Sequence, residues 1–139
     1  MKITLTGEHG EKYSYDFSNE NSHAVIGRAG NADVQIKISP KYKVKEFKKT
    51  GNLGYLKETP EIMLVSKYHC ELEFSDGKVK VRDLGSRNKT YVNDSMLNGE
   101  SLELEDNSVL SLGEHCPLRV RLINRKSLLD KLKKVFWTD

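Results

Sequence analysis

Polar side chains gather where three alternating hydrophobic segments of the sequence begin or end. They are Arg28, directly after Gly27, then Ser66, Lys67 and His69, and finally Ser86, Arg87 and Asn88. The set offers guanidinium, ammonium, hydroxyl and amide groups, and it contains no carboxylate that could serve as a base. Such donors and positive charge suit a tetrahedral dianion held by charge-assisted hydrogen bonds. If the three segments converge in space, we expect an anion-binding site.

The elements that would position these residues are short strands. Period-2 alternation of apolar and polar residues marks the segments 2–6, 12–17, 23–28, 33–38, 69–74, 78–84, 90–93 and 117–123. Many short strands with closely spaced turns predict an all-β fold, a β-sandwich of two mostly antiparallel sheets. In a sandwich the strand-end loops gather at one edge, so residues far apart in sequence can form one site.

Residues 39–63 interrupt this rhythm. The segment contains Pro40 and Pro60, and it shows no sustained alternation. Between positions 37 and 49 there are six lysines against the single Glu46. The sequence predicts a long basic surface loop inserted between two strands, and loops of this length are usually functional or disordered. An acidic partner would suit the lysines of 37–49, but an ordinary solvated loop explains them equally well.

Residues 124–139 differ from the rest of the chain because their pattern is helical. Ser127 and Asp130 fit a capping box. The apolar stripe that follows consists of Leu128, Leu129, Leu132, Val135 and Phe136. We therefore expect a short C-terminal amphipathic helix or tail. It would pack on its own sandwich, on a partner or on a membrane surface, since so short a helix is marginal alone.

The composition fits one globular domain. The chain has 139 residues, 37% of them hydrophobic and 31% charged, with a net charge of +3. The sequence lacks a run of 18 apolar residues and a signal-peptide pattern, so we expect a cytoplasmic protein without a membrane span. Cys70 and Cys116 do not form a C-x-x-C pair, and we expect both to be buried, reduced thiols.

No catalytic pattern emerges from the sequence. The four histidines are scattered without metal-ligand spacing, and neither a nucleophile elbow nor a phosphate-binding P-loop is present. The glycine-rich segment 27–33 lies between two predicted strands rather than at a helix start, which argues against a nucleotide cradle. We therefore expect a protein that is not an enzyme and that needs no metal or cofactor.

In their order along the chain, these motifs resemble a known family. Gly27-Arg28, Ser66-x-x-His69 and Gly85-Ser86-x-Asn88-x-Thr90, each at a predicted strand end, resemble the forkhead-associated (FHA) domain, a β-sandwich that binds phosphothreonine peptides. The resemblance spans roughly residues 3–123. It implies an FHA-like unit over residues 1–123 that carries the 39–63 insertion.

The resemblance also implies roles for individual residues. The residues that would contact the phosphopeptide are Arg28, Ser66, Lys67, Arg87 and Asn88. Those that would hold the geometry of the loops are Gly27, His69 and Thr90. Other interpretations stay open from the residues alone: Arg28 in a surface ion pair, Ser66 as a turn hydroxyl, Lys67 merely solvated, and Asn88 capping its own turn.

One residue departs from the family pattern beside the expected site. Lys89 stands where the family often has glycine, which suits a positive φ, whereas lysine would be strained there. Either the turn differs in this chain, or Lys89 is tolerated at some cost.

The sequence thus favours a non-catalytic signalling adaptor that recognises phosphothreonine in a protein partner. Two alternatives remain. One is a phosphate-independent scaffold or oligomerisation domain, for which Arg28→Ala would leave partner binding unchanged. The other is a nucleic-acid binder that works through the lysines of the insertion, and it is the less favoured of the two.

Overall fold

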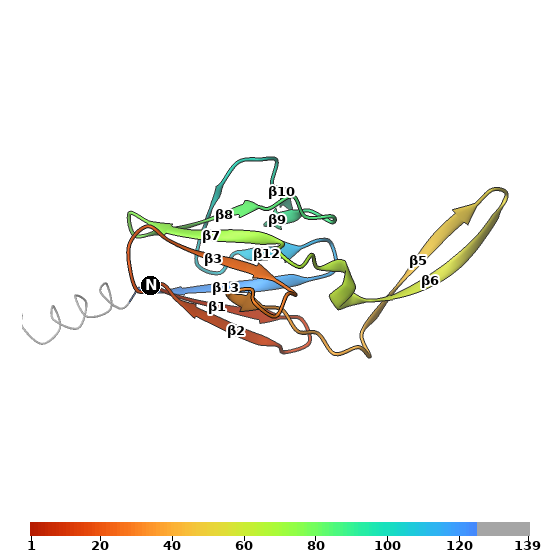
Figure 1. Ribbon diagram of the computed structural model, residues 1–139, viewed down its shortest axis with the longest axis horizontal. Coiled ribbons are helices and arrows are strands. Elements are labelled where there is room, and N and C mark those ends of the chain that lie inside the picture. The colour runs from red at the N-terminus through yellow and green to blue at the C-terminus, as the bar shows by residue number, and fades with distance from the viewer. Residues whose placement is uncertain (125–139) are drawn as a thin grey trace, which may run out of the picture.

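The computed structural model describes residues 1–124 and consists almost entirely of β-strands (Figure 1). In the first half of the chain the strands are β1 (Lys2–Gly7), β2 (Lys12–Asp16), β3 (Ser22–Gly27), β4 (Val34–Gln35), β5 (Lys43–Thr50) and β6 (Leu53–Pro60). A 3-10 helix, η1 (Glu61–Leu64), follows. The remaining strands are β7 (Cys70–Ser75), β8 (Lys78–Asp83), β9 (Thr90–Val92), β10 (Ser95–Met96), β11 (Leu102–Leu104), β12 (Val109–Leu112) and β13 (Pro117–Ile123).

Two sheets stack face to face. The six-stranded sheet has the order β10-β9-β12-β13-β1-β2, and the five-stranded sheet has the order β11-β8-β7-β3-β4. All pairings in them are antiparallel except that of β3 with the short β4. The predicted all-β sandwich of two mostly antiparallel sheets is therefore confirmed.

The core lies between the sheets and follows from the alternation in the sequence. Ile3 and Leu5 on β1 point inward, as do Leu72 on β7 and Val81 on β8, and all four side chains are fully buried. Their sequence neighbours are more exposed, as the period of 2 requires. Cys70 and Cys116 are both buried and unpaired, and burial raises the pKa of the Cys116 thiol to about 12. The expectation of buried thiols outside a disulfide is therefore confirmed.

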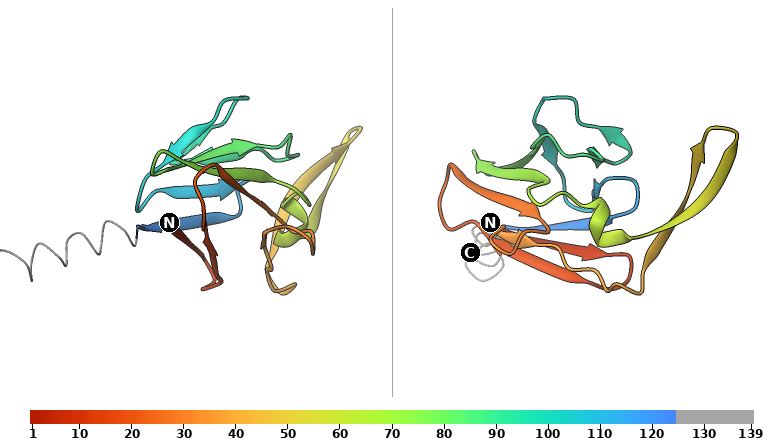
Figure 2. Two further views of the ribbon diagram at one scale, coloured as in Figure 1. Left: turned by 60° about the vertical axis from the view of Figure 1, so that its left-hand side comes forward. Right: turned by 45° about the vertical axis from the view of Figure 1, so that its right-hand side comes forward.

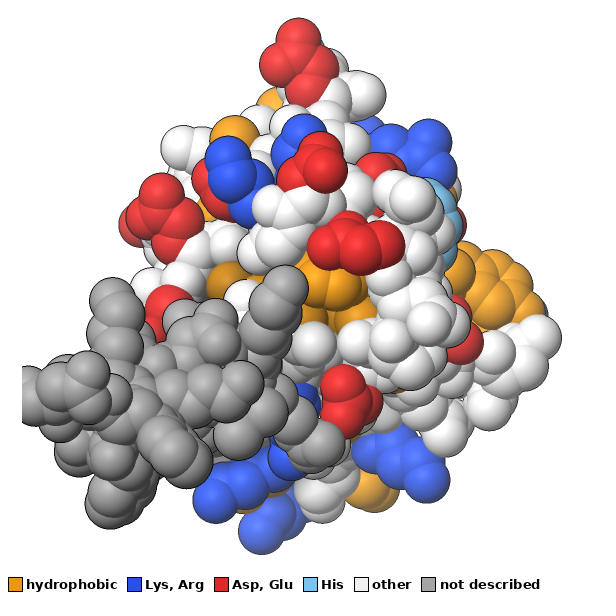
Figure 3. All heavy atoms as spheres, turned by 90° about the vertical axis from the view of Figure 1, so that its left-hand side faces the viewer, with side chains coloured by type: hydrophobic (Ala, Val, Ile, Leu, Met, Phe, Trp, Pro, Cys, Tyr) orange, Lys and Arg blue, Asp and Glu red, His pale blue; other side chains and the backbone are white. Residues whose placement is uncertain are grey.

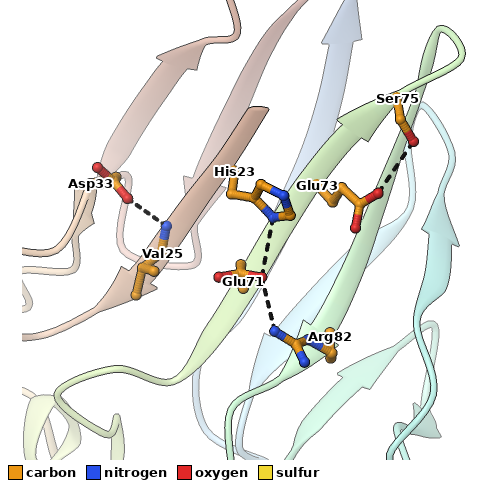
Figure 4. A network of polar contacts seen from close by, with 7 residues as sticks. All are labelled: His23, Val25, Asp33, Glu71, Glu73, Ser75 and Arg82. Carbon is orange, nitrogen blue, oxygen red and sulfur yellow. Dashed lines mark hydrogen bonds and ion pairs between the residues drawn. The ribbon is translucent and has the colours of Figure 1, made fainter. Parts of the chain in front are cut away.

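The outer surfaces carry mixed charge. At the end of the molecule that bears the N-terminus, acidic and basic side chains are interspersed (Figure 3). On the outer face of the five-stranded sheet, the Glu71 carboxylate lies 3.3 Å from His23 Nδ1 and 3.0 Å from Arg82 Nη2, which links β3, β7 and β8 (Figure 4). Because His23 and Arg82 are exposed, this network adds little to stability.

The prediction of a long surface loop at 39–63 is wrong. Strands β5 and β6 pair antiparallel from Lys43↔Pro60 to Thr50↔Leu53 and form a two-stranded arm (residues 43–60) that projects from the sandwich (Figures 1 and 2). Gly51-Asn52 closes the arm, with Gly51 at φ 61°, the positive φ that the first position of a type II′ turn requires. Apolar alternation is weak here because both faces of the arm meet solvent.

The end of the arm is apolar as well as basic. Its exposed hydrophobic side chains are Phe47 (65%), Leu53 (79%), Tyr55 (53%) and Leu56 (69%). The Phe47 ring covers Gly54 across the strand pair, so that a Cβ at Gly54 would lie 1.9 Å from the ring. Glycine inside a strand normally weakens it, but at Gly54 the absence of a side chain makes room for the Phe47 ring.

The predicted C-terminal helix within 124–139 lies, from residue 125 onward, outside the described residues. Within residues 1–124, the structure contains no helix long and apolar enough to cross a membrane.

Candidate functional site

The three polar segments singled out in the sequence meet at the end of the sandwich that bears the arm. The Arg28 amide, just after β3, donates to the Ser66 carbonyl at 3.1 Å, and the next amide, of Ala29, donates to the Lys67 carbonyl at 3.2 Å. From the β8–β9 loop, the Arg87 amide donates to Ser66 Oγ at 3.1 Å. Residues separated by up to 60 positions thus form one surface, which we call the recognition edge (Arg28, Ser66, Lys67, Arg87 and Asn88).

Gly27 is required by close packing of two backbones. A Cβ at this position would lie 1.9 Å from the Lys67 carbonyl oxygen and 2.6 Å from its carbonyl carbon. Neither contact is sterically possible, so any side chain at Gly27 would push the Ser66–Lys67 segment away. The absence of a side chain at Gly27 therefore lets the Ser66–Lys67 segment lie directly against the end of β3.

His69 joins the loops from inside. Its side chain is fully buried, and Nδ1 accepts a hydrogen bond from the Ser66 amide at 3.1 Å. Nε2 must then carry the proton, and it donates to the Lys89 carbonyl at 2.8 Å. Burial lowers the pKa of His69 below its ordinary value of 6.5, even though the bond to Lys89 opposes this shift. The neutral His69 ring thus connects the Ser66 amide with the Lys89 carbonyl.

This buried histidine predicts a stability that depends on pH. The unfolded chain binds a proton near pH 6.5, whereas folded His69 resists it, so stability decreases as pH falls below about 6.5. The slope that His69 contributes is positive and has an upper limit of about 1.4 kcal/mol per pH unit, the value for one proton. Denaturant unfolding between pH 7.5 and pH 5 would measure it, with His69→Gln as the control because glutamine does not titrate. Identical slopes in both proteins would contradict this account.

Asp83 organises the β8–β9 loop. Its carboxylate accepts hydrogen bonds from the Gly85 and Ser86 amides at 2.9 and 3.0 Å, from Ser86 Oγ at 2.5 Å and from Thr90 Oγ1 at 2.6 Å. Partial burial alone would raise the pKa of Asp83, but the bonds from Ser86, Thr90 and Gly85 together hold it below its ordinary value. Thr90 is thereby placed as a structural residue at the start of β9.

The cationic groups and the hydroxyl of the recognition edge remain available to bind a ligand. Arg28 Nε donates to the Val65 carbonyl at 2.8 Å, and this bond fixes the guanidinium plane. Within residues 1–124, the terminal nitrogens of Arg28, the Lys67 ammonium and the Arg87 guanidinium form no ion pair. Because Ser66 Oγ accepts from the Arg87 amide, its own proton remains available to donate.

Asn88 is connected to the segment that follows the arm. Its Nδ2 donates to the Leu64 carbonyl at 2.8 Å, so the amide does not cap its own turn. This bond orients the side chain and leaves Oδ1 as an acceptor. Leu64 ends η1, and the arm therefore connects directly to the recognition edge.

Lys89 adopts the backbone conformation that glycine would favour. Its φ is 68°, so the turn is kept and the lysine is strained, at a cost of about 1–2 kcal/mol. The Lys89 carbonyl in this turn accepts bonds from His69 and from the Gly113 amide at 2.8 Å each. These two bonds hold the strained turn in place.

We expect Lys89→Gly to stabilise the fold. Relief of the left-handed strain outweighs the greater chain entropy of glycine and leaves a gain of about 0.5–1 kcal/mol. Urea unfolding would measure the gain. Lys89→Ala is the matched control, because it removes the charge and keeps the strain. If the glycine variant were no more stable than the alanine variant, the strain would not exist.

Sequence reasoning placed the insertion just before the Ser66 loop, where it could overhang a peptide groove, but it did not identify the hairpin. A groove of about 390 Å³ separates the arm from the recognition edge, and it is lined by Lys48, Lys57, Met63, Leu64, Arg87 and Asn88, among others. The Gly51-Asn52 pair was the one available signal for a hairpin. Nothing in the sequence indicated toward which side such a hairpin would lean.

Comparison with known proteins decides the family. The family model of the FHA domain matches residues 24–113, which is most of the sandwich. The chain belongs to the FHA domain family. The match includes Arg28, Ser66 and Asn88, so the resemblance inferred from the three motifs is confirmed.

Solved structures show the same fold. An FHA domain from an analysis of phosphothreonine-dependent FHA domain interactions is 22% identical, with 89% of this chain and 99% of that chain covered and a TM-score of 0.60. The FHA domain of an Arabidopsis thaliana protein is 22% identical (88% and 86% covered, TM-score 0.59). The N-terminal FHA domain of Saccharomyces cerevisiae Rad53p, in complex with a phosphothreonine peptide, is 16% identical (91% and 97% covered, TM-score 0.61). No curated protein matches the chain.

Proposed function

We propose that this FHA domain binds phosphothreonine in a partner protein and thereby recruits that partner, without catalysing a reaction. The observation that carries the proposal is the recognition edge itself. Arg28, Lys67 and Arg87 present cationic donors without an ion-pair partner in residues 1–124, and Ser66 adds a hydroxyl whose proton is available. A phosphate dianion satisfies such donors better than a carboxylate, because it offers three strong acceptor oxygens.

Each residue of the edge has a place in the proposal. Arg28, held by Val65, would bond phosphate oxygens, and Ser66 would donate its hydroxyl proton to another. Lys67 and Arg87 are exposed and add charge-assisted bonds from two sides. The Asn88 amide, oriented by Leu64, would bond the peptide main chain. Gly27, His69 and Thr90 would act only through the loops that they hold.

Family and neighbours support this proposal. FHA domains are in general interaction modules, and the Rad53p domain of the same fold is complexed with a phosphothreonine peptide. Fluorescence anisotropy with a degenerate phosphothreonine library and its phosphoserine and unphosphorylated counterparts tests it. We expect saturable binding to the phosphothreonine peptides. Binding to phosphoserine should be roughly fivefold weaker, because phosphoserine lacks the methyl group that would be buried. The affinity for phosphothreonine should decrease as the salt concentration rises. Binding indifferent to phosphate would overturn the proposal.

The arm supports a second candidate, phosphate-independent protein contact. Phe47 and Leu56 on one face of the arm, and Leu53 and Tyr55 on the other, expose apolar area of the kind that protein interfaces bury. The same anisotropy experiment separates the two candidates. Binding that survives without phosphate and disappears when residues 43–60 are replaced by a short Gly-Ser linker would favour this scaffold function.

A further inference from the structure

We infer that the arm selects the peptide sequence beside the phosphothreonine, because Lys57 and Arg87 form a receptor for a carboxylate. This inference rests on the proposed function. It assigns a specificity role to the arm and names the chemistry of the flanking residue, an aspartate or glutamate.

The arm is fixed relative to the recognition edge at its base. The Glu61 amide, after β6, donates to the Tyr42 carbonyl, before β5, at 3.0 Å. His9, in the β1–β2 turn, stacks on Tyr42 with a centroid separation of 3.4 Å, and its Nε2 lies 3.1 Å from Glu61 Oε2. Together with the bond from Asn88 to Leu64, these contacts hold the arm against the sandwich.

One face of the arm borders the peptide site. In the register of β5 and β6, Glu46 lies opposite Lys57, and Lys48 lies opposite Tyr55, so these four side chains share a face. Lys45 and Lys49 lie on the other face. The groove between arm and edge is lined by Glu46, Lys48 and Lys57 from the first face and by Arg87 and Asn88 from the edge. It continues the recognition edge, since the Arg87 amide bonds Ser66.

Two cations of the groove lack a direct ion-pair partner among residues 1–124. Its carboxylates are Glu46 and Glu58, and each already lies near an arm lysine, Glu46 at 3.1 Å from Lys48 and Glu58 at 3.9 Å from Lys45. A hydrogen bond from Lys48 lowers the pKa of Glu46 accordingly, and the charge of Lys57, opposite Glu46 in the register, also lowers it. Within residues 1–124, Lys57 and Arg87 form no ion pair. An extended peptide that leaves the phosphate site through this groove would bring a flanking carboxylate to both.

Peptide titrations with charge-swapped protein test the inference. The probes are phosphothreonine in a neutral Gly-Ser-Ala host, the same peptide with two aspartates before or after the phosphothreonine, and the same peptide with two lysines there. For the wild type we expect roughly three- to tenfold tighter binding of the aspartate peptide than of the neutral one, on one side only. Lys57→Glu should abolish this preference and favour the lysine peptide on that side.

The matched control is Lys49→Glu, which changes the charge equally on the opposite face. It should keep the preference for aspartate. Equal preferences in the two variants, or a wild type indifferent to flanking charge while it still binds the neutral phosphopeptide, would overturn the inference and leave the proposed function intact. Failure of every phosphopeptide to bind would instead remove both.

Discussion

Arg28→Ala should weaken binding of a phosphothreonine peptide by roughly 30- to 100-fold, the value of a charge-assisted bond to a dianion. The guanidinium stands between the Val65 carbonyl, to which Nε donates, and the open edge beside Ser66. Its loss removes both the charge and the anchor. Isothermal titration calorimetry at low salt, with circular dichroism to verify folding, would measure the effect.

Two further variants separate geometry from charge. Arg28→Lys keeps the charge, but an ammonium lacks the planar guanidinium donors that can bond the Val65 carbonyl and a phosphate at the same time. The variant should therefore recover only part of the affinity. Arg119→Ala removes the same charge from an exposed position on β13 and should change the affinity by less than about twofold. If Arg119→Ala and Arg28→Ala weakened binding equally, general electrostatics rather than the recognition edge would be responsible.

Asp83→Ala should destabilise the fold by about 3 kcal/mol and lower the melting temperature by about 10 °C. The substitution removes the acceptor for four hydrogen bonds, from the Gly85 and Ser86 amides and from the Ser86 and Thr90 hydroxyls. Thr90 and Ser86 are buried, so their donors would stay unsatisfied. Differential scanning calorimetry would measure the loss.

The same carboxylate makes this effect depend on pH. Because the folded-state pKa of Asp83 lies below its ordinary value of 3.8, its contribution is complete above that value and is lost as pH falls through the folded pKa. The difference between wild type and Asp83→Ala should therefore shrink in acid. The exposed Glu105, replaced by alanine, serves as the control and should cost less than about 0.5 kcal/mol. A cost for Asp83→Ala as small as that of the control would contradict the role of Asp83.

The sandwich was predictable because each of its strands has one face buried in the core and one face exposed to solvent. Ile3 and Leu5 alternate with threonines, and Leu72 and Phe74 alternate with glutamates, so the period of 2 appears directly in the sequence. The recognition edge was predictable for a related reason. Arg28, Ser66 and Asn88 lie in the loops next to strand ends, and a sandwich brings such loops together at one edge.

The arm was not predictable in the same way. Its strands bury neither face against the sandwich, so Phe47, Leu53 and Leu56 follow no period that burial would impose. The partners of Asn88 and Arg28 were also hidden, because both are backbone carbonyls, of Leu64 and Val65, to which any sequence could contribute. At Lys89 the residue type argued against the observed turn. The hydrogen bonds to its carbonyl hold a positive φ that lysine itself disfavours.

The most direct test of the account is an NMR titration of the 15N-labelled protein with a phosphothreonine peptide. We predict that the largest shifts occur at the amides of Arg28, Ser66, Lys67, Arg87 and Asn88 and at Arg28 Nε, and that the unphosphorylated peptide leaves them in place. Shifts confined to the tip of the arm or to the outer faces of the sheets, or equal shifts with both peptides, would contradict a phosphothreonine site at the recognition edge.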